Sequence, residues 1–424
     1  MISAYQELSW RGLISQVTHD DLNDTLDKGP ITLYAGFDPT ADSLHIGSLI
    51  PIMGLLHFQR AGHTPIILVG GATGLIGDPS FKAQERQLLT PEQVQINAAG
   101  IRKQLESFIS FEGENAAIMV NNMDWMGEWS FIDFLRDIGK HFNVNTMMAR
   151  DSVKQRLNDR EHGMSYTEFS YSLLQAYDFL HLYDGHKCTL QIGGSDQWGN
   201  IVAGMDLTRR MREDVKSYGL TLPLVTKSDG SKFGKTESGN IWLDPERTSP
   251  YKFYQFWLNQ ADSDVITYLK YFTVLPENVI AELESKTEEA PHERAAQKAL
   301  AEDMTLRVHG QDALDNAMKA SKAMFGGELT GLDEATLQDV FSEVPSSDLD
   351  RSILSADKTL LDILTENEVF ASKGEARRMI KNGGLYLNNT RVDDDGPFSS
   401  ESLLTESMAV IRKGKKNYFL IRIQ

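Results

Sequence analysis

Apolar and polar positions follow two periodicities over residues 30 to about 220, one typical of strands and one typical of helices. Short runs rich in β-branched and aromatic residues predict four buried strands, ITLYAGF, TPIILVGG, AAIMVNN and CTLQIGG, which begin at residues 31, 64, 116 and 188. Longer runs between them have helical periodicity, and LIPIMGLLHFQRAGH predicts a helix with a broad apolar face that ends near Gly62. Strands that alternate with helices favour an α/β domain, in which a doubly wound parallel sheet carries helices on both faces.

The pattern becomes helical from about residue 248 to 325, where SPYKFYQFWLNQ opens on a Ser-Pro helix start. Residues 326–357 are acidic and contain several Gly, Ser and Asp residues, which predicts a linker or a loosely packed connection. A final unit begins near Lys358 and contains two short helices followed by one strand, LYLNNTRV. We therefore expect four parts, at residues 1–223, 224–325, 326–357 and 358–424.

Composition describes an ordinary globular protein, with 41% hydrophobic and 24% charged residues. The single cysteine, Cys188, excludes an intrachain disulfide and a cysteine-based zinc site, and suits a reducing cytoplasm. The first residues lack a basic region followed by a long apolar core, and no apolar run approaches the roughly 18 residues that a membrane span needs. We expect neither a signal peptide nor a membrane segment.

The net charge of −18 argues at first against a nucleic-acid partner. The charge is unevenly spread, because residues 371–424 carry 10 Lys and Arg residues against 6 Asp and Glu residues, a net charge of +4. The rest of the chain therefore has a net charge of −22. This asymmetry predicts an acidic body with a more basic C-terminal module.

Three polar or glycine-rich turns follow predicted strands, at residues 36–48, 70–80 and 193–200. The carboxyl ends of parallel strands border one crevice, so the three turns are expected to face each other. In the first turn, His45 and Gly47 lie where a helix begins, and free backbone N–H groups at that place favour an anion. A capped helix start with an incidental histidine is the alternative, and these few residues alone favour it.

Two lysine- or glycine-containing loops resemble nucleotide-binding motifs without matching them. In DGSKFGKTESG, residues 229–239, the glycines are one residue too close for a phosphate-binding P-loop. Lys232 and Lys235 in this loop suit a triphosphate, and the alternative is a solvated surface loop, which explains most runs of Lys and Gly. In GGATGLIGDPS the glycines are spaced G-x-x-G-x-x-G, which departs from the dinucleotide fingerprint. Asp78 at its end suits a substrate ammonium, and a tight structural turn is the alternative.

A polar stripe runs along the predicted helix YTEFSYSLLQAYDFL, where Tyr171, Gln175 and Asp178 share one face. Apolar side chains flank this stripe on nearly every side, which favours a pocket lining over a wetted surface. After the fourth strand, Asp196 and Gln197 lie in QIGGSDQWGN. They form either an Asx-type turn or a site for a ribose.

The order and spacing of these motifs resemble bacterial tyrosyl-tRNA synthetases over essentially the whole chain. PTADSLHIGS and KFGKT are similar to the two signatures of that class I family, and GGATGLIGDPS, NNMDW, SYSLLQAYD and GGSDQWGN to its blocks around tyrosine and ATP. The last 67 residues resemble a small α+β RNA-binding domain that some ribosomal proteins also contain. The resemblance implies a Rossmann-like catalytic domain at 1–223, the second signature loop with an α-helical domain at 224–325, and an RNA-binding domain at 358–424.

The implied reaction joins L-tyrosine to ATP, releasing pyrophosphate, and then transfers tyrosine to the 3′-terminal adenosine of tRNA(Tyr). It needs no protein nucleophile, no editing domain, no tightly bound cofactor and no protein-held metal, and Mg²⁺ arrives with ATP. A cytoplasmic homodimer is also implied, since FLRDIGKHFNV, residues 134–144, resembles the family's subunit interface.

Residue roles follow from the same resemblance. Catalytic residues around the reacting phosphates are His45, Lys82, Arg86, Lys232, Lys235 and Thr236. Tyrosine-binding residues are Tyr34 and Asp178 at the phenolic hydroxyl, Asp78, Tyr171 and Gln175 at the ammonium, and Gln197. ATP-binding residues are Gly36, Asp38, Thr40, His45, Gly47, Ser48, Gly194, Asp196 and Lys235. Asn122 is a further candidate near the ribose and the carboxylate. RNA-binding residues are Arg377, Arg378, Lys381, Arg412, Lys413, Lys415 and Lys416.

One position departs from the family pattern, because Ser48 stands where the first signature usually has its second histidine. A hydroxyl donates a hydrogen bond but carries no charge, so we expect retained activity with a smaller contribution from this position. Three alternatives remain open. A tryptophan enzyme of the same fold is disfavoured by Tyr34 and Asp178, a catalytically silent RNA-binding paralogue by the intact lysines, and a small-metabolite nucleotidyltransferase by the C-terminal module.

Overall fold

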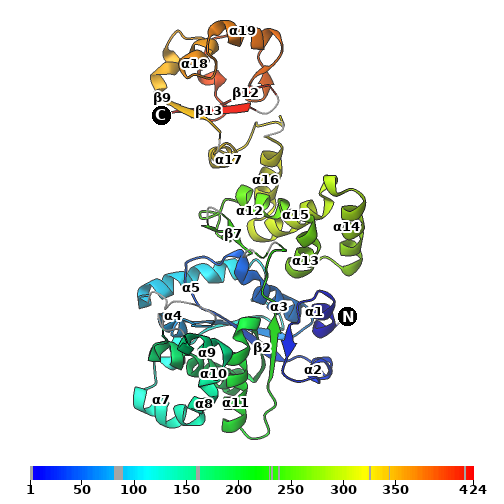
Figure 1. Ribbon diagram of the computed structural model, residues 1–424, viewed down its shortest axis with the longest axis vertical. Helices are drawn as coiled ribbons and strands as arrows, with labels where there is room; N and C mark the ends of the chain where they lie inside the picture. The colour runs from blue at the N-terminus through cyan, green and yellow to red at the C-terminus, as the bar shows by residue number, and fades with distance from the viewer. Residues whose placement is uncertain are drawn as a thin grey trace. The chain divides into compact units, whose positions relative to one another are not determined.

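The computed structural model describes residues 3–80, 89–158, 163–228, 230, 233–236, 239–323, 326–342, 344–414 and 417–424. The chain divides into two compact units. The first comprises Met1–Asp244 and Ala261–Ala296, and the second comprises Pro245–Gln260 and Gln297–Gln424. Figure 1 labels the helices and strands of both units.

The first unit is built on a six-stranded sheet in the order β1-β6-β5-β2-β3-β4. The strands are β1 (Gln16–Val17), β2 (Thr32–Phe37), β3 (Thr64–Val69), β4 (Ile118–Asn121), β5 (Cys188–Gly194) and β6 (Tyr218–Leu222). Neighbours β6-β5-β2-β3-β4 are parallel, and β1 pairs with β6 in the antiparallel sense. The four expected strands and the parallel sheet are confirmed, whereas β1 and β6 were not anticipated from the sequence.

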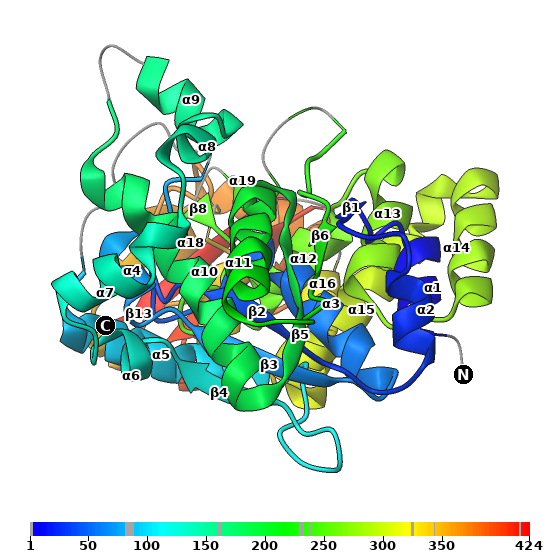
Figure 2. The same cartoon turned by 90° about the horizontal axis from the view of Figure 1, so that it is seen from below.

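Helices cover both faces of this sheet (Figure 2). On one face lies α3 (Leu49–Arg60), which packs so closely that a Cβ at Gly54 would lie 3.0 Å from Leu222 and 3.1 Å from Ile192. On the other face lie α10 (Tyr166–His186) and α11 (Trp198–Met211), and a Cβ at Gly219 would lie 2.4 Å from Ile201 of α11. The expected doubly wound architecture is therefore present.

The first unit contains further helices. They are α1 (Ala4–Trp10), α2 (Leu22–Asp27), α4 (Thr73–Ile76), α5 (Pro91–Leu105), α6 (Met123–Met126), α7 (Phe131–Asp137), α8 (Val144–Met148), α9 (Asp151–Asn158), α13 (Asp262–Phe272) and α14 (Glu277–Glu289). A short two-stranded sheet pairs β7 (Lys235–Thr236) with β8 (Gly239–Asn240). None of the helices in the described ranges is long and apolar enough to cross a lipid bilayer.

The second unit combines helices with a five-stranded sheet in the order β11-β10-β12-β13-β9. Its helices are α12 (Pro250–Leu258), α15 (Ala295–His309), α16 (Gln311–Ala323), α17 (Glu334–Val340), α18 (Leu360–Glu366) and α19 (Lys373–Lys381). Its strands are β9 (Ser346–Leu349), β10 (Leu385–Leu387), β11 (Thr390–Arg391), β12 (Met408–Lys413) and β13 (Asn417–Ile423). The Ser-Pro start is confirmed, because Ser249 caps α12 and Pro250 is its first residue.

Both faces of this second sheet are buried. Ala409 and Ile411 of β12 pack against α18 and α19, while the alternate residues Met408 and Val410 pack against α16 and α17. A sheet covered on both sides explains the continuous apolar run in β12, since successive strand residues point to opposite faces.

The segment expected to be a linker differs from that expectation. Residues 326–357 contain α17 and strand β9, which pairs in parallel with β13. Leu337 and Phe341 of this segment are buried in the cluster beneath the sheet. A second difference concerns LYLNNTRV, which forms the hairpin β10–β11 and not one strand. Asn388 and Asn389 both adopt positive φ at its turn, the conformation that two-residue hairpin turns need.

Candidate active site

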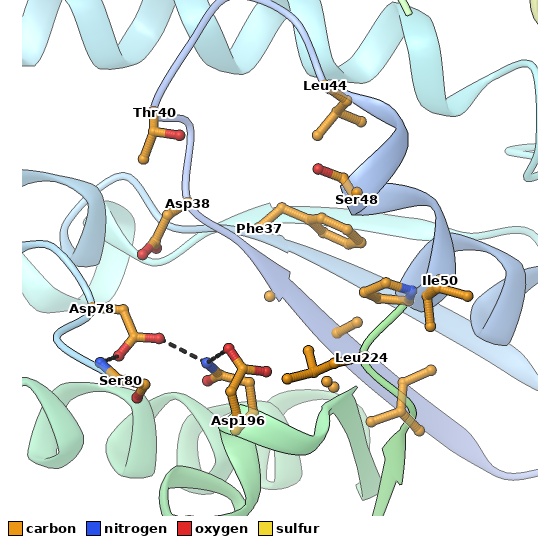
Figure 3. A pocket seen from close by; sticks show the side chains of 18 of the residues that line it. Phe37, Asp38, Thr40, Leu44, Ser48, Ile50, Asp78, Ser80, Asp196 and Leu224 are labelled. Atoms are coloured by element: carbon orange, nitrogen blue, oxygen red, sulfur yellow. Dashed lines mark hydrogen bonds between the residues drawn. The ribbon is translucent and has the colours of Figure 1, made fainter. Parts of the chain in front are cut away.

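A cavity of about 610 Å³ lies in the first unit at the carboxyl ends of its parallel strands. The three turns singled out in the sequence all line it (Figure 3). Fourteen of the expected site residues line this cavity: Tyr34, Gly36, Asp38, Thr40, His45, Gly47, Ser48, Asp78, Tyr171, Gln175, Asp178, Gly194, Asp196 and Gln197. Lys82, Arg86 and Lys232 lie outside the described residues, and for Lys235 and Thr236 the description covers the backbone alone.

Asp178 forms a buried acidic group in the cavity wall, with 1% of its surface exposed. Its carboxylate accepts hydrogen bonds from Asn122 Nδ2 at 3.1 Å and from the indole N–H of Trp125 at 2.8 Å. Burial raises the pKa of Asp178 to about 7, although both hydrogen bonds act in the opposite direction. Asn122 is itself held in place, because its Oδ1 accepts the N–H of Ala72 at 2.7 Å.

Tyr34, on β2, places a second polar group in the same wall. Its side chain is 1% exposed, and its hydroxyl has no hydrogen-bond partner in the described part of the chain. Burial, and next the charge of Asp178, raise the pKa of Tyr34. A buried hydroxyl without a partner is costly, so this site is suited to a ligand that supplies one.

Asp38 receives hydrogen bonds from two hydroxyl groups that come from different elements, Thr73 of α4 and Tyr171 of α10. The hydroxyl of Thr73 donates to Oδ1 at 2.8 Å, and the hydroxyl of Tyr171 donates to Oδ2 at 3.1 Å. The expected ammonium ligand Tyr171 is thus tied to a carboxylate that the resemblance assigned to ATP.

Gln197 lies beside two further carboxylates of the cavity, those of Asp78 and Asp196. Its Nε2 donates to Asp78 at 2.7 Å, and its Oε1 accepts from Gln175 at 3.3 Å (Figure 3 shows the Asp78 contact). Burial, and then the charge of Asp78, raise the pKa of Asp196. The mutual repulsion of these carboxylates gives this side of the cavity an affinity for a cation.

His45 lies at the start of the short turn η1 (Ile46–Ser48). Its Nδ1 accepts the N–H of Gly47 at 3.0 Å, so in the neutral ring the proton sits on Nε2. The imidazole meets Trp242 edge to face, with ring centroids 5.9 Å apart. Nε2–H is therefore the atom with which His45 can donate to an anion in the cavity.

Three residues of this site were missed in the sequence. Gln191 lines the cavity from β5 with 2% of its surface exposed, and no described residue bonds to its Oε1. A polar residue inside the apolar strand CTLQIGG is the signal that marks it. Trp125 donates a hydrogen bond to Asp178, and Thr73 donates one to Asp38. No sequence pattern predicts these contacts, because the paired residues are far apart in the chain.

The basic residues of the second unit fall into two groups. Arg377, Arg378 and Lys381 are exposed on α19. By contrast, Arg412 stacks over the ring of Tyr386 and donates to Asn389, and Lys413 pairs with Glu375 at 3.0 Å. Lys415 and Lys416 lie outside the described residues. The structure therefore offers the α19 residues for contact with a partner more readily than Arg412 and Lys413.

Comparison with known proteins identifies the class to which this fold and site belong. The family described as class I tRNA synthetases (W and Y) matches residues 26–326, and the SYY-like C-terminal domain of tyrosine--tRNA ligase matches residues 336–421. A C-terminally truncated mitochondrial tyrosyl-tRNA synthetase from Aspergillus nidulans has a similar structure, with a TM-score of 0.68 and 31% identity, covering 76% of this chain and 94% of that chain. The fold and site thus define a class I aminoacyl-tRNA synthetase.

Two curated relatives narrow the assignment. Tyrosine--tRNA ligase 1 of Bacillus cereus is 52% identical over 420 residues, 98% of this chain and 99% of its own. Tyrosine--tRNA ligase of Bacillus caldotenax is 53% identical over 419 residues, 98% of each chain. The chain belongs to the tyrosine--tRNA ligase family, and this sets aside the tryptophan enzyme, the silent paralogue and the small-metabolite transferase.

Proposed function

We propose that the cavity binds L-tyrosine and ATP together and forms tyrosyl-adenylate with release of pyrophosphate. The same site then transfers the tyrosyl group to the 3′-terminal adenosine of tRNA(Tyr). The observation that carries this proposal is the buried pair of Tyr34 and Asp178, a hydroxyl without a partner in the described chain beside a hydrogen-bonded carboxyl. A phenolic hydroxyl between these two groups donates to Asp178 and bonds to Tyr34.

Selection against phenylalanine follows from this arrangement. Phenylalanine brings the same ring without the hydroxyl, so the Tyr34 hydroxyl and one lone pair of Asp178 stay buried and unpaired. The free-energy cost of these unpaired groups weakens the binding of phenylalanine and leaves the binding of tyrosine unaffected. Such discrimination needs no second editing site.

The ammonium group of tyrosine is assigned to the acidic side of the cavity. Asp78, with Gln175 and Tyr171, supplies acceptors there. Burial, and next the charge of Asp78, raise the pKa of Asp196 on the same side. A cation relieves that repulsion. Gln197 already bonds to Asp78 and Gln175, which holds these side chains in place before the substrate arrives.

ATP is assigned to the part of the cavity lined by the turn from Gly36 to Ser48. His45 donates from Nε2 to the reacting phosphates, and Thr40 and Ser48 add hydroxyl donors. The ribose lies near Asp196 and Gly194. The remaining residues proposed to bind the phosphates are assigned from the sequence motifs: Lys82, Arg86, Lys232, Lys235 and Thr236. Mg²⁺ enters with ATP and is held mainly by the phosphates.

Catalysis then depends on positioning and on charge stabilisation. The tyrosine carboxylate is the nucleophile and pyrophosphate the leaving group, so the protein forms no covalent bond to the substrate. Side chains that donate to the phosphates stabilise the negative charge that grows on the leaving group.

We also propose that the enzyme is a homodimer through an apolar surface on α7 and α8. Phe131 and Ile132 are 66% and 68% exposed, and Val144 is 55% exposed. Within the expected interface segment, Ile138 instead belongs to the core of the subunit. A second copy is the partner that covers this surface. The variant Ile132→Asp is expected to sediment as a monomer. The control is Leu306→Asp, at an apolar position on α15 that is 45% exposed.

The C-terminal unit is assigned to tRNA, with Arg377, Arg378 and Lys381 of α19 contacting its phosphates. We assign the enzyme to the cytoplasm, where its single cysteine, Cys188, stays a buried thiol. Residues 1–223, 224–325 and 358–424 remain the proposed catalytic, helical and RNA-binding parts.

Charging of tRNA tests this function. The full-length chain is incubated with ATP, labelled tyrosine and a tRNA(Tyr) transcript, and the charged tRNA is separated on an acid gel. The expected product is tyrosyl-tRNA that disappears when ATP is omitted. Charging of tRNA(Tyr) with tryptophan, or no charging at all, contradicts the proposal.

A further inference from the structure

The second signature, KFGKT, lies in the segment that joins β6 to β8. Two described parts of this segment contact α13, a helix that comes later in the chain and carries no residue of the proposed catalytic set. The contacts lie at Ser228, before the motif, and at Phe233, within it.

Ser228 is tied to the first turn of α13. Its backbone N–H donates to both oxygens of Asp264, at 3.2 and 3.3 Å, and its hydroxyl lies 2.9 Å from that of Ser263. The Asp264 side chain is 8% exposed and lies near the helix N-terminus, where the helix dipole favours a carboxylate.

Phe233 is held by two aromatic rings of the same helix. Its own side chain is 8% exposed. Its ring stacks on Phe272 with an interplanar angle of 9° and centroids 5.2 Å apart, and it meets Tyr268 at 4.9 Å. Asp264, Tyr268 and Phe272 are spaced four residues apart, so they form one continuous face of α13.

The opposite side of the motif contacts the first signature. Gly234 has φ +81°, and a Cβ at this position would lie 3.0 Å from Ile46. The N–H of Ile241 donates to the carbonyl of Gly234, and the N–H of Ile46 donates to the carbonyl of Ile241. The pair Phe233-Gly234 therefore lies between α13 and the turn that begins at His45.

We propose that α13 is the docking platform of the second signature, and that Phe233, Phe272 and Asp264 are positioning residues for tyrosine activation. Lys232 and Lys235 flank Phe233-Gly234 in the sequence, so the place of their backbone depends on how Phe233 is seated. The platform acts through these lysines and touches no substrate. This inference rests on the proposed activation of tyrosine by ATP.

The test compares two truncations on one helix. Phe272→Ala removes the stacking partner of Phe233, and Tyr271→Ala removes an aromatic ring of α13 that faces Gly12. Tyrosine binding is measured at equilibrium without ATP, and adenylate formation is measured by rapid mixing with ATP. Phe272→Ala is expected to slow adenylate formation about tenfold and to leave the tyrosine dissociation constant within twofold of wild type. Tyr271→Ala is expected to change neither quantity by more than twofold.

A double-mutant cycle shows whether the effect passes through the lysines. In a Lys232→Ala/Lys235→Ala background, Phe272→Ala is expected to slow the reaction by less than twofold, because both groups that it positions are gone. Phe272→Leu, which keeps an apolar side chain at the position, is expected to recover part of the rate.

Three results would overturn the inference: an unchanged rate in Phe272→Ala, a full tenfold effect in the Lys232→Ala/Lys235→Ala background, or parallel loss of tyrosine binding. A wild-type chain that forms no adenylate contradicts the proposed function instead.

Discussion

Replacing Tyr34 by phenylalanine removes one buried hydroxyl and leaves its ring in the edge contact with Phe179. In the ligand-free protein this hydroxyl has no partner in the described chain, and leaving such a group buried costs about 1–3 kcal/mol. The variant is therefore expected to be more stable than wild type by about 1 kcal/mol.

The same change has the opposite effect on catalysis with the correct substrate. In the complex, the hydroxyl of Tyr34 bonds to the phenol, and a neutral hydrogen bond is worth about 0.5–1.5 kcal/mol. We expect kcat/KM for tyrosine to fall about two- to twelvefold, and kcat/KM for phenylalanine to stay unchanged or to rise.

The assay is ATP–pyrophosphate exchange with each amino acid, together with thermal unfolding of the ligand-free protein. Tyr183→Phe, which removes a hydroxyl on α10 outside the cavity, is the matched control. A lower unfolding temperature in Tyr34→Phe, or an equal loss of kcat/KM for tyrosine and phenylalanine, would refute this reasoning.

Further predictions follow from the cavity and from α19. The raised pKa of Asp178, about 7, means that its carboxylate is lost as the pH falls below that value, so tyrosine affinity should weaken by about tenfold per pH unit below 7. Asp178→Asn should flatten this profile in equilibrium binding, and a wild-type profile that is already flat contradicts the assignment. Asn122→Ala removes a donor to Asp178 and should weaken tyrosine binding about tenfold, with ATP binding unchanged. Ser48→His adds a donor at the phosphates and should lower the KM for ATP in exchange assays, and unchanged ATP kinetics remove any role for Ser48. Arg378→Ala should weaken tRNA binding in filter assays and reduce its salt dependence, with less effect from Lys413→Ala, and the reverse order excludes α19 as the contact.

The sequence predicted the elements in which buried side chains recur with a regular period along the chain. The strands at Thr32, Thr64, Ile118 and Cys188 are short apolar runs. Three of them are buried on both faces, and the edge strand at Ile118 is half-buried. Strand β9, SSDL, has no apolar period because it is an edge strand whose formation depends on pairing with β13. The prediction of a linker at residues 326–357 was wrong for a similar reason. The few leucines of this segment are buried because they pack against the second sheet, and the sequence pattern of the segment does not show that sheet.

The candidate site was predictable where its residues lie on one element. Tyr171, Gln175 and Asp178 share a helix face, and all three line the cavity. The residues that hydrogen-bond to these side chains lie on other elements, as Asn122 and Trp125 do for Asp178. Contacts of this kind join segments more than 50 residues apart, so no local pattern records them.

Amino-acid-dependent ATP–pyrophosphate exchange without tRNA tests the central claim most directly. Tyrosine, phenylalanine and tryptophan are compared at equal concentration with the full-length chain. Exchange with tyrosine alone is the predicted result, because the Tyr34–Asp178 pair is built for a hydroxyl. Exchange with tryptophan in place of tyrosine, or with phenylalanine as readily as with tyrosine, would contradict the role given to that pair.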